Sequence, residues 1–228
     1  MTPLSMKTPP PSTLDQYPPT EALDTIIELK VGQHPNIKSF FVHKDLITFF
    51  SGFFRAAICG NFAEAASGVV NLPTEDADTV AAFISLLYFR ILPVSSGETS
   101  KFWPICTLWI LADRWETPIM ANALIDHMRD QAVTLWIHPS NLLNLMYENA
   151  LESPGLRRFA TMVVVAVLSN KKLKEMQETF EWSSDVRLGI LQELLSHGTD
   201  RKLVGREELA MLDLCQYHQH KEGVRCSK

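Results

Sequence analysis

The chain has 228 residues, of which 46% are hydrophobic and 21% charged, and its formal net charge is −5 at pH 7. This length can form one large or two small globular domains. The 21 Lys and Arg residues are scattered along the chain without a dense basic run. Because clustered cations carry phosphate binding, the composition argues against nucleic acid as a partner.

The sequence carries no signal for export or for membrane insertion. The longest apolar stretch, Met162–Leu168, is far shorter than the roughly 20 residues of a membrane span, so it predicts a buried helix. The N-terminal residues lack the apolar centre of a signal peptide. The four cysteines are too few for a disulfide framework. We therefore expect an intracellular protein, cytoplasmic or nuclear, with reduced thiols and without a membrane partner.

Residues 1–22 are rich in proline, with runs at Pro9–Pro11 and Pro18–Pro19. Few apolar side chains accompany these prolines. A segment of this kind cannot bury enough surface to offset its ordering entropy. The sequence predicts a disordered leader.

Three segments have the pattern of β-strands. In Thr25–Val31 every second residue from Ile27 on is apolar, which is typical of a strand with one buried face. Turn-forming residues separate this segment from Ile37–His43, so the two are expected to form a hairpin. Gly68–Leu72 is a third candidate strand.

Helices are expected between and after these strands. In the helix that Thr74 would cap, apolar residues from Val80 to Leu87 recur with helical spacing. Phe41 and Phe54 are expected to point into the core of this region. Residues 93–99 are expected to form a loop. The expected helices are Asp45–Phe50, Gly52–Ile58, one from Thr74 to near Phe89, Phe102–Trp115 and Ile119–Gln131.

After Pro139 the pattern becomes entirely helical, and short turns predict antiparallel neighbours in a small bundle. The expected helices are Asn141–Leu151, Gly155–Leu168, Leu173–Trp182, Ser184–Ser196 and Glu207–Tyr217. The predicted fold class is α+β, a small sheet capped by helical hairpins and followed by a helical region. The predicted divisions are a leader (1–22), an interaction domain (23–131), a helical extension (132–217) and a flexible tail (218–228).

Catalytic signatures are missing from the sequence. The patterns GxGxxG, GxxxxGK[ST], GxSxG and HExxH do not occur, so the common nucleotide-binding, hydrolase and zinc-protease motifs are not represented. His43 and Lys44 stand between a strand and a helix. A partly buried histidine held by a local hydrogen bond is favoured there over a catalytic base. No catalytic residue and no cofactor are predicted.

Four potential metal ligands lie at the C-terminus, in the spacing C-x2-H-x-H-x5-C. Such nitrogen and sulfur ligands are what tetrahedral Zn²⁺ prefers. His218 and His220, however, cannot share a helix face. A frayed polar tail is therefore favoured, and structural zinc is the alternative. The candidate ligands are Cys215, His218, His220 and Cys226.

Six segments in order between Asp24 and Gln131 resemble a BTB/POZ domain. The family motif residues include Asp24, His43, Lys44, Ser51 and Phe54. The matching segments are Asp24–Val31, Phe40–Ile47 (FFVHKDLI), Ser51–Ala57, Phe62–Glu64 with Gly68–Leu72, Val80–Arg90, and Leu111–Trp115 with Pro118. The region after them resembles the helical extensions of short fungal BTB proteins.

This resemblance implies a small sheet capped by helical hairpins and a role in protein–protein interaction. Many BTB domains form homodimers, and some act as adaptors that bind a cullin and recruit substrates to a ubiquitin ligase. The resemblance places a cullin-facing surface at Phe62, Glu64, Leu111, Asp113 and Trp115. The alternatives are a transcription-associated factor that binds partner proteins and an enzyme with a site of a new type.

Overall fold

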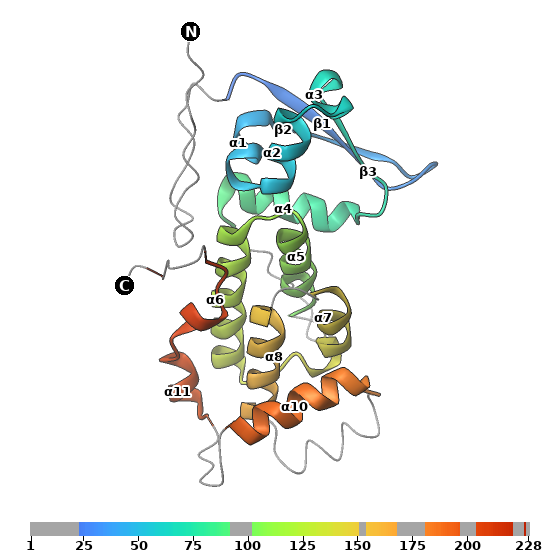
Figure 1. Cartoon of the computed structure of the whole chain (residues 1–228). Coiled ribbons are helices and arrows are strands. Elements are labelled where there is room, and N and C mark those ends of the chain that lie inside the picture. Colours follow the sequence, from blue (N-terminus) through green and yellow to red (C-terminus); the bar gives the residue numbers. More distant parts are fainter. Residues whose placement is uncertain are drawn as a thin grey trace. The chain divides into compact units, whose positions relative to one another are not determined.

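The computed structural model describes residues 23–91, 102–150, 154–167, 181–196, 204–220 and 226. The chain is a mixed α+β protein with a small sheet (Figure 1), so the α+β part of the predicted fold class is confirmed. Contacts divide it into two compact units. The first is built mainly from residues 23–91 and 107–123, and the second mainly from residues 124–219. The division falls earlier than the predicted boundary after Gln131.

The first unit contains a three-stranded sheet with the order β2-β1-β3. β1 (Ile26–Val31) pairs antiparallel with β2 (Lys38–His43), which agrees with the predicted hairpin. It pairs in parallel with β3 (Val69–Leu72). Alternate residues of β1, from Ile27 to Val31, are buried. The period of two in the sequence thus identified the inner face of the central strand.

The register of β2 corrects the prediction for Phe41. Val42 lies opposite Ile27 and is buried with it. Successive side chains of a strand point to opposite faces. Phe41, one residue earlier, therefore points away from the core, and it is 68% exposed. The prediction that Phe41 points into the core is therefore wrong.

Helices follow the strands in the first part of the chain. The bounds are α1 (Lys44–Phe50), α2 (Gly52–Cys59), α3 (Ala63–Ser67), α4 (Ala77–Phe89), α5 (Trp103–Arg114) and α6 (Pro118–Leu135). α3 was not predicted from the sequence, because it is only five residues long. This helix ends at Gly68, which has a φ of 67°. Glycine adopts this left-handed conformation without a steric cost, so it is suited to end a helix.

α4 starts later than expected because its cap is Asp76 and not Thr74. The Asp76 carboxylate accepts hydrogen bonds from the backbone amide and the hydroxyl of Thr79, each at 2.8 Å. Both hydrogen bonds lower the pKa of Asp76, and the bond from the backbone amide of Thr79 has the larger effect. A carboxylate at this position satisfies an amide that has no partner inside the helix.

The core of the first unit is centred on three aromatic rings. Trp115 makes edge-on contacts with Phe54 and with Phe83, at centroid distances of 4.9 Å and 4.7 Å. All three rings are buried, which confirms the predicted burial of Phe54. The buried hydroxyl of Ser51 donates a hydrogen bond to the carbonyl oxygen of Trp115 and accepts one from the Phe54 amide. The start of α2 is thereby fixed to the residues that follow α5.

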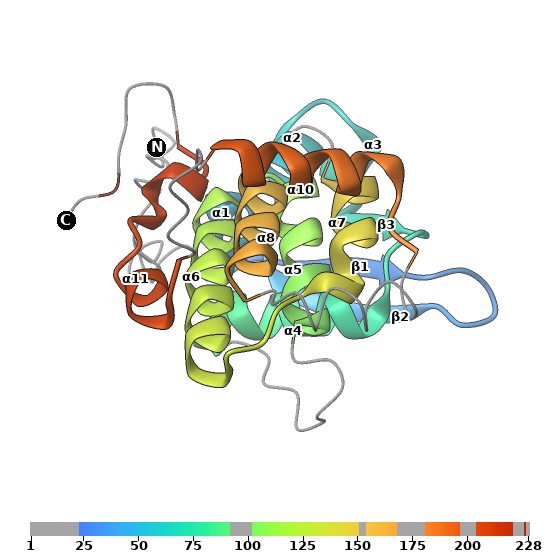
Figure 2. The same ribbon diagram turned by 90° about the horizontal axis from the view of Figure 1, so that it is seen from below.

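The second unit is helical in its described residues. Figure 2 shows α7, α8 and α10 side by side, in agreement with their contacts. The described residues of α8 from Met162 to Val167 are buried, as expected for the apolar stretch. The bounds are α7 (Leu143–Asn149), α8 (Pro154–Val167), α10 (Ser184–Ser196), α11 (Arg206–Ala210), and the 3₁₀ helices η2 (Ser140–Leu142) and η3 (Leu214–Tyr217).

The predicted helix Glu207–Tyr217 is interrupted. α11 ends at Ala210, and η3 begins after Asp213. The Asp213 carboxylate accepts a hydrogen bond from the backbone amide of Cys215 and so caps the new turn. Asp competes with helical hydrogen bonding in this way, which explains why the single helix predicted from the sequence is wrong here.

Several predicted features lie outside the described residues. These are the leader 1–22, the loop 93–99 and nearly all of the helix expected at Leu173–Trp182. Among the helices that the structure does describe, none combines the length and the apolar composition needed to cross a membrane.

Candidate partner-binding surface

The turn between α2 and α3 brings Phe62 to the surface. Gly60 ends α2, and its amide donates a hydrogen bond to the carbonyl oxygen of Ala56 at 3.0 Å. A Cβ atom at position 60 would collide with that same oxygen and press on the ring of Phe62. Glycine at this position therefore allows the chain to turn closely and place Phe62 directly after it.

Phe62 is presented to solvent at the start of α3. It has extended backbone angles, precedes the first residue of the helix, and is 61% exposed. Glu64 lies in the first turn of α3 and is partly exposed. A carboxylate is favourable there because the start of a helix carries a partial positive charge. A large aromatic ring beside an acidic group forms the most conspicuous part of the predicted partner surface.

Two of the predicted partner residues belong to the core instead. Leu111 is 3% exposed and Trp115 is 1% exposed. Both sit on the inner face of α5 or just beyond its end, so the folded first unit cannot offer them to a partner. Asp113, between them in the sequence, is partly exposed and remains accessible. The candidate surface is therefore reduced to Phe62, Glu64 and Asp113.

These three residues do not form one compact cluster. The amide of Gly52, at the start of α2, donates a hydrogen bond to the carbonyl oxygen of Glu116 at 3.1 Å. Asp113 is therefore near the start of α2, whereas Phe62 follows its end. The eight residues of α2 correspond to a length of about 12 Å, at 1.5 Å per residue. A partner that touches both Phe62 and Asp113 would have to span this helix.

The family-motif residues are mostly structural. The hydroxyl of Tyr88 lies 2.9 Å from the backbone nitrogen of His43 and 2.8 Å from its Nδ1. His43 is thus partly buried and hydrogen-bonded, but its partner is on α4, 45 residues away, so the bond is not the local one that the sequence predicted. The amide of Lys44 donates to the carbonyl oxygen of Thr25, just beyond the paired ends of β1 and β2. Asp24 is exposed and accepts a hydrogen bond from the Thr25 hydroxyl.

Two other phenylalanines are exposed although the sequence did not predict it. Phe41 on β2 and Phe89 at the end of α4 are each 68% exposed. The strand register could have identified Phe41, since Val42 is part of the apolar alternation and its neighbour must point outward. Phe89 follows Tyr88 and precedes Arg90, which ends α4 in a left-handed conformation. Nothing in the local sequence distinguishes this ring from a buried one.

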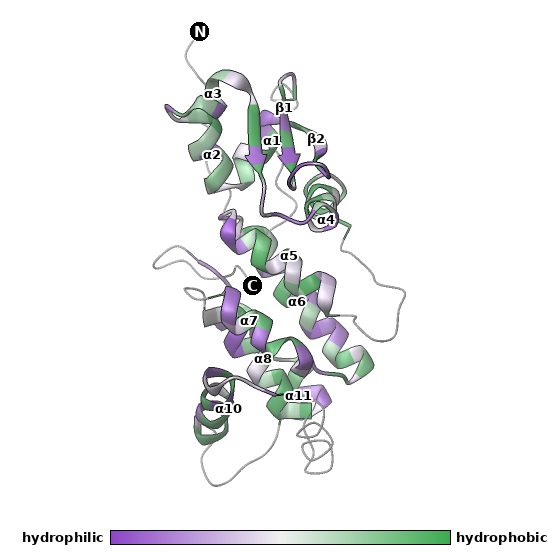
Figure 3. Cartoon of the chain, turned by 90° about the vertical axis from the view of Figure 1, so that its right-hand side faces the viewer, coloured by the Kyte–Doolittle hydropathy of each residue, from purple (hydrophilic) through white to green (hydrophobic). Residues whose placement is uncertain are grey.

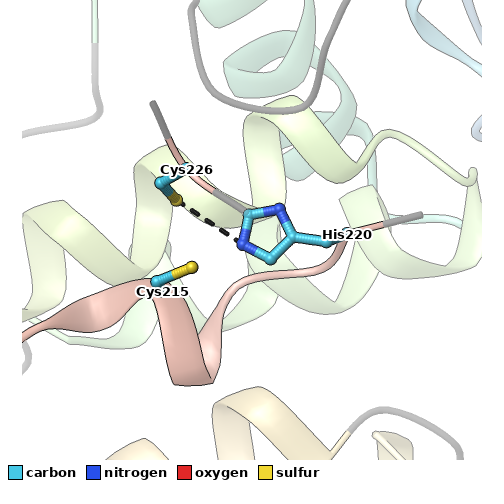
Figure 4. A group of neighbouring side chains, drawn as sticks. All are labelled: Cys215, His220 and Cys226. Atoms are coloured by element: carbon cyan, nitrogen blue, oxygen red, sulfur yellow. Dashed lines mark hydrogen bonds between the residues drawn. The ribbon is translucent and has the colours of Figure 1, made fainter. Parts of the chain in front are cut away.

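Two of the four candidate metal ligands contact each other. Sγ of Cys226 lies 3.5 Å from Nε2 of His220, and both residues are partly buried (Figure 4). Cys215 belongs to the second unit. His218, the remaining candidate, is directed elsewhere. Its Nε2 lies 3.1 Å from Oδ1 of Asp126, and its side chain is 8% exposed. The description of this segment as a frayed tail is therefore wrong for His218.

Comparison with known proteins gives no assignment. No model of a protein family matches the chain, and no curated protein sequence matches it significantly.

Proposed function

We propose that this chain is a non-catalytic protein–protein interaction module of the BTB/POZ type. It acts inside the cell, in the cytoplasm or the nucleus, as a self-associating scaffold or as an adaptor for other proteins. The observation that carries the proposal is the exposed Phe62, held at a closely turned helix start beside an acidic residue.

The order of the motif segments supports the BTB/POZ assignment. The segment Phe40–Ile47 runs from β2 into α1, and Ser51–Ala57 covers the start of α2. The motif Leu111–Trp115 contains the last turn of α5. Ser51 and Phe54 from one motif contact Trp115 from another. Residues that define the resemblance in the sequence thus support one another in the fold.

The energetics of an exposed aromatic ring support a docking role for Phe62. Burying a phenylalanine side chain on binding is favourable by about 1.5–3 kcal/mol relative to leaving it in water. Aromatic anchors of this kind dominate many protein interfaces. The partly exposed Glu64 would contribute at the rim, where charge affects association rate and salt dependence more than affinity.

The sharper form of the proposal is an adaptor that binds a cullin and so recruits substrates to a ubiquitin ligase. Phe62 and Glu64 lie in the segment that resembles the cullin-facing step of the family. Leu111 and Trp115 no longer contribute to this surface, because both are buried. The adaptor role therefore depends on Phe62, Glu64 and Asp113.

Two measurements on the full chain test the proposal. Light scattering coupled to size-exclusion chromatography measures self-association over a range of concentrations. Quantitative mass spectrometry after affinity capture identifies proteins that bind the chain but not its Phe62→Ala variant. A dimer, or a cullin lost from the variant, is the expected result. A monomer at every concentration, with the same captured proteins for both baits, would contradict the proposal.

A further inference from the structure

We propose that the outer edge of β2, formed by the backbone of Ser39 and Phe41, binds an extended acidic segment of a partner protein as an additional strand. Among the strands that the structure describes, β2 pairs with β1 alone and so lies at one edge of the sheet. Adding a strand to an exposed edge is a recurring mode of peptide recognition. The proposal goes beyond the role of Phe62, which stands before α3 and is not part of this edge.

The backbone of β2 faces β1 at every second residue. The amide of Glu28 is directed toward the β3 side of β1, where it donates a hydrogen bond at 2.9 Å. The next residue, Leu29, therefore faces β2, and it lies opposite Phe40. Hydrogen-bonded pairs alternate with non-bonded pairs in an antiparallel ladder. The amides and carbonyl groups of Ser39 and Phe41, on either side of Phe40, consequently point away from β1.

These backbone groups of Ser39 and Phe41 remain available to a further strand. The next outward-facing amide along β2, that of His43, is bonded to the hydroxyl of Tyr88 at 2.9 Å, which closes that end of the edge. In the part of the chain that the structure describes, the backbone groups of Ser39 and Phe41 have no such partner. Two donors and two acceptors repeated at every second residue match the backbone of one short extended segment.

Apolar side chains beside the outer edge of β2 give an added strand a surface to pack on. Phe41 and Ile26 are both more than half exposed. Ile26 lies opposite His43, so it is a diagonal neighbour of Phe41 on the same face, within reach of an aromatic ring. Exposed edges are usually protected by charged side chains, proline or a covering element. A phenylalanine in the middle of an edge instead favours association.

The charge along this edge favours an acidic segment. Lys38 begins β2 and Lys44 follows it, and no acidic residue lies between them. On the neighbouring strand, the carboxylate of Glu28 accepts a hydrogen bond from the Ser39 hydroxyl and pairs with Lys30. Within the described residues, neither Lys38 nor Lys44 has a carboxylate at salt-bridge distance. Acidic side chains at the ends of the added strand would complement these lysines and select the partner.

The test titrates the isotope-labelled full chain with a capped peptide, DTVTVTD, and follows amide exchange by NMR. The peptide places valines on one face and aspartates at both ends. The amides of Ser39 and Phe41 should exchange rapidly in the free protein and become protected as the peptide binds. N-methylation at one set of alternate peptide residues should abolish binding and at the other set should not, because only one row of backbone groups faces β2. The basic peptide KTVTVTK should bind at least about tenfold more weakly.

Variants of β2 provide matched controls. Ser39→Pro removes an outward-facing amide and should weaken peptide binding by at least about tenfold. Ser39→Ala keeps that amide and should bind as the parent does. Phe41→Ala should weaken binding by about tenfold through lost apolar contact, with an unchanged urea midpoint. The N-methylated peptides leave the protein unaltered, so they decide the question even if Ser39→Pro destabilises the fold.

Several results would overturn the proposal. One is no binding of DTVTVTD up to about 1 mM, and another is equal binding of the two N-methylated forms or of KTVTVTK. Protection of the Ser39 and Phe41 amides in the free protein would mean that another segment of the chain already covers the edge. Protection that rises with protein concentration would identify a second copy as the occupant, which would support self-association and contradict the acidic partner segment.

Discussion

The aromatic residues of the first unit fall into two groups with opposite surroundings. Phe54, Phe83 and Trp115 contact one another in the core. Phe41, Phe62 and Phe89 are more than half exposed. All of these side chains are aromatic, so the difference comes from placement. The buried rings point inward from α2, from α4 and from the residue after α5, whereas the exposed ones lie on the outer face of β2, before α3 and at the end of α4.

The largest expected effect on the free energy of unfolding comes from removing one of the buried aromatic rings. Phe54→Ala removes a ring that is fully buried against Trp115, and a cavity of this kind costs about 3–5 kcal/mol in the free energy of unfolding. Urea denaturation followed by circular dichroism measures the loss. Phe41→Ala is the control, since its ring is exposed and surface changes stay within about 0.5 kcal/mol. Equal losses in the two variants would show that the assigned faces of α2 and β2 are wrong.

Removing the buried hydroxyl of Ser51 should have the next largest effect on the free energy of unfolding. Ser51→Ala leaves the Trp115 carbonyl and the Phe54 amide without the hydroxyl that joins them. Leaving buried groups unsatisfied costs about 1–3 kcal/mol. The shift in the urea midpoint reports this loss. Ser39→Ala, on an exposed residue of β2, should leave the midpoint nearly unchanged, and a midpoint shift of equal size in both would refute the structural role of Ser51.

The N-cap residue Asp76 of α4 should contribute less to stability than Ser51 does, and its contribution should depend on pH. Asp76→Ala is expected to cost about 1 kcal/mol at pH 7, because the Thr79 amide loses its acceptor. The bonds from Thr79 lower the pKa of Asp76 below its ordinary value of 3.8. The contribution is therefore present above pH 3.8 and is lost as the pH falls through the lower folded value.

Thermal unfolding at pH 7 and at pH 2 to 3 measures this dependence on the wild type and on Asp76→Ala. The difference between the two proteins should shrink in acid. Asp78→Ala serves as the control, since Asp78 lies in the first turn without acting as the cap. A difference that does not change with pH would mean that the charge of Asp76 does not stabilise the helix.

Exposed leucines of the second unit should have the smallest effect. Leu188, Leu191 and Leu195 on α10 are exposed, and Figure 3 shows much of that helix in the colour of hydrophobic residues. Leu195→Ser should change the free energy of unfolding by less than about 0.5 kcal/mol. Denaturation by urea tests this. A loss of several times that size would mean that Leu195 is covered in solution.

Local patterns predicted most of the first unit. The alternation from Ile27 to Val31 identified the buried face of β1, and the turn residues after it identified the hairpin. The parallel pairing of β1 with β3 could not be predicted, because it joins segments that are distant in the sequence. α3 was missed because five residues are too few for a helical period to show.

Side-chain placement was harder to predict than secondary structure. The exposure of Phe62 follows from the close turn at Gly60, which the sequence only suggested as a loop. Leu111 and Trp115 were expected to face a partner because of a family motif, but motif membership does not distinguish a core residue from a surface residue. The helix break at Asp213, whose carboxylate accepts a hydrogen bond from the amide of Cys215, was not revealed by helical periodicity.

The measurement that tests the central claim most directly compares Phe62→Ala with Phe89→Ala. Both remove an exposed phenylalanine from the first unit, so both should leave the urea midpoint unchanged. Binding is then measured for the partner protein, or the second copy of the chain, captured by the wild type. Phe62→Ala should lose most of this binding, and Phe89→Ala should retain it. Binding that is equal in the two variants, or a Phe62→Ala variant that unfolds as readily as a core mutant, would contradict the assignment of Phe62 as the docking residue.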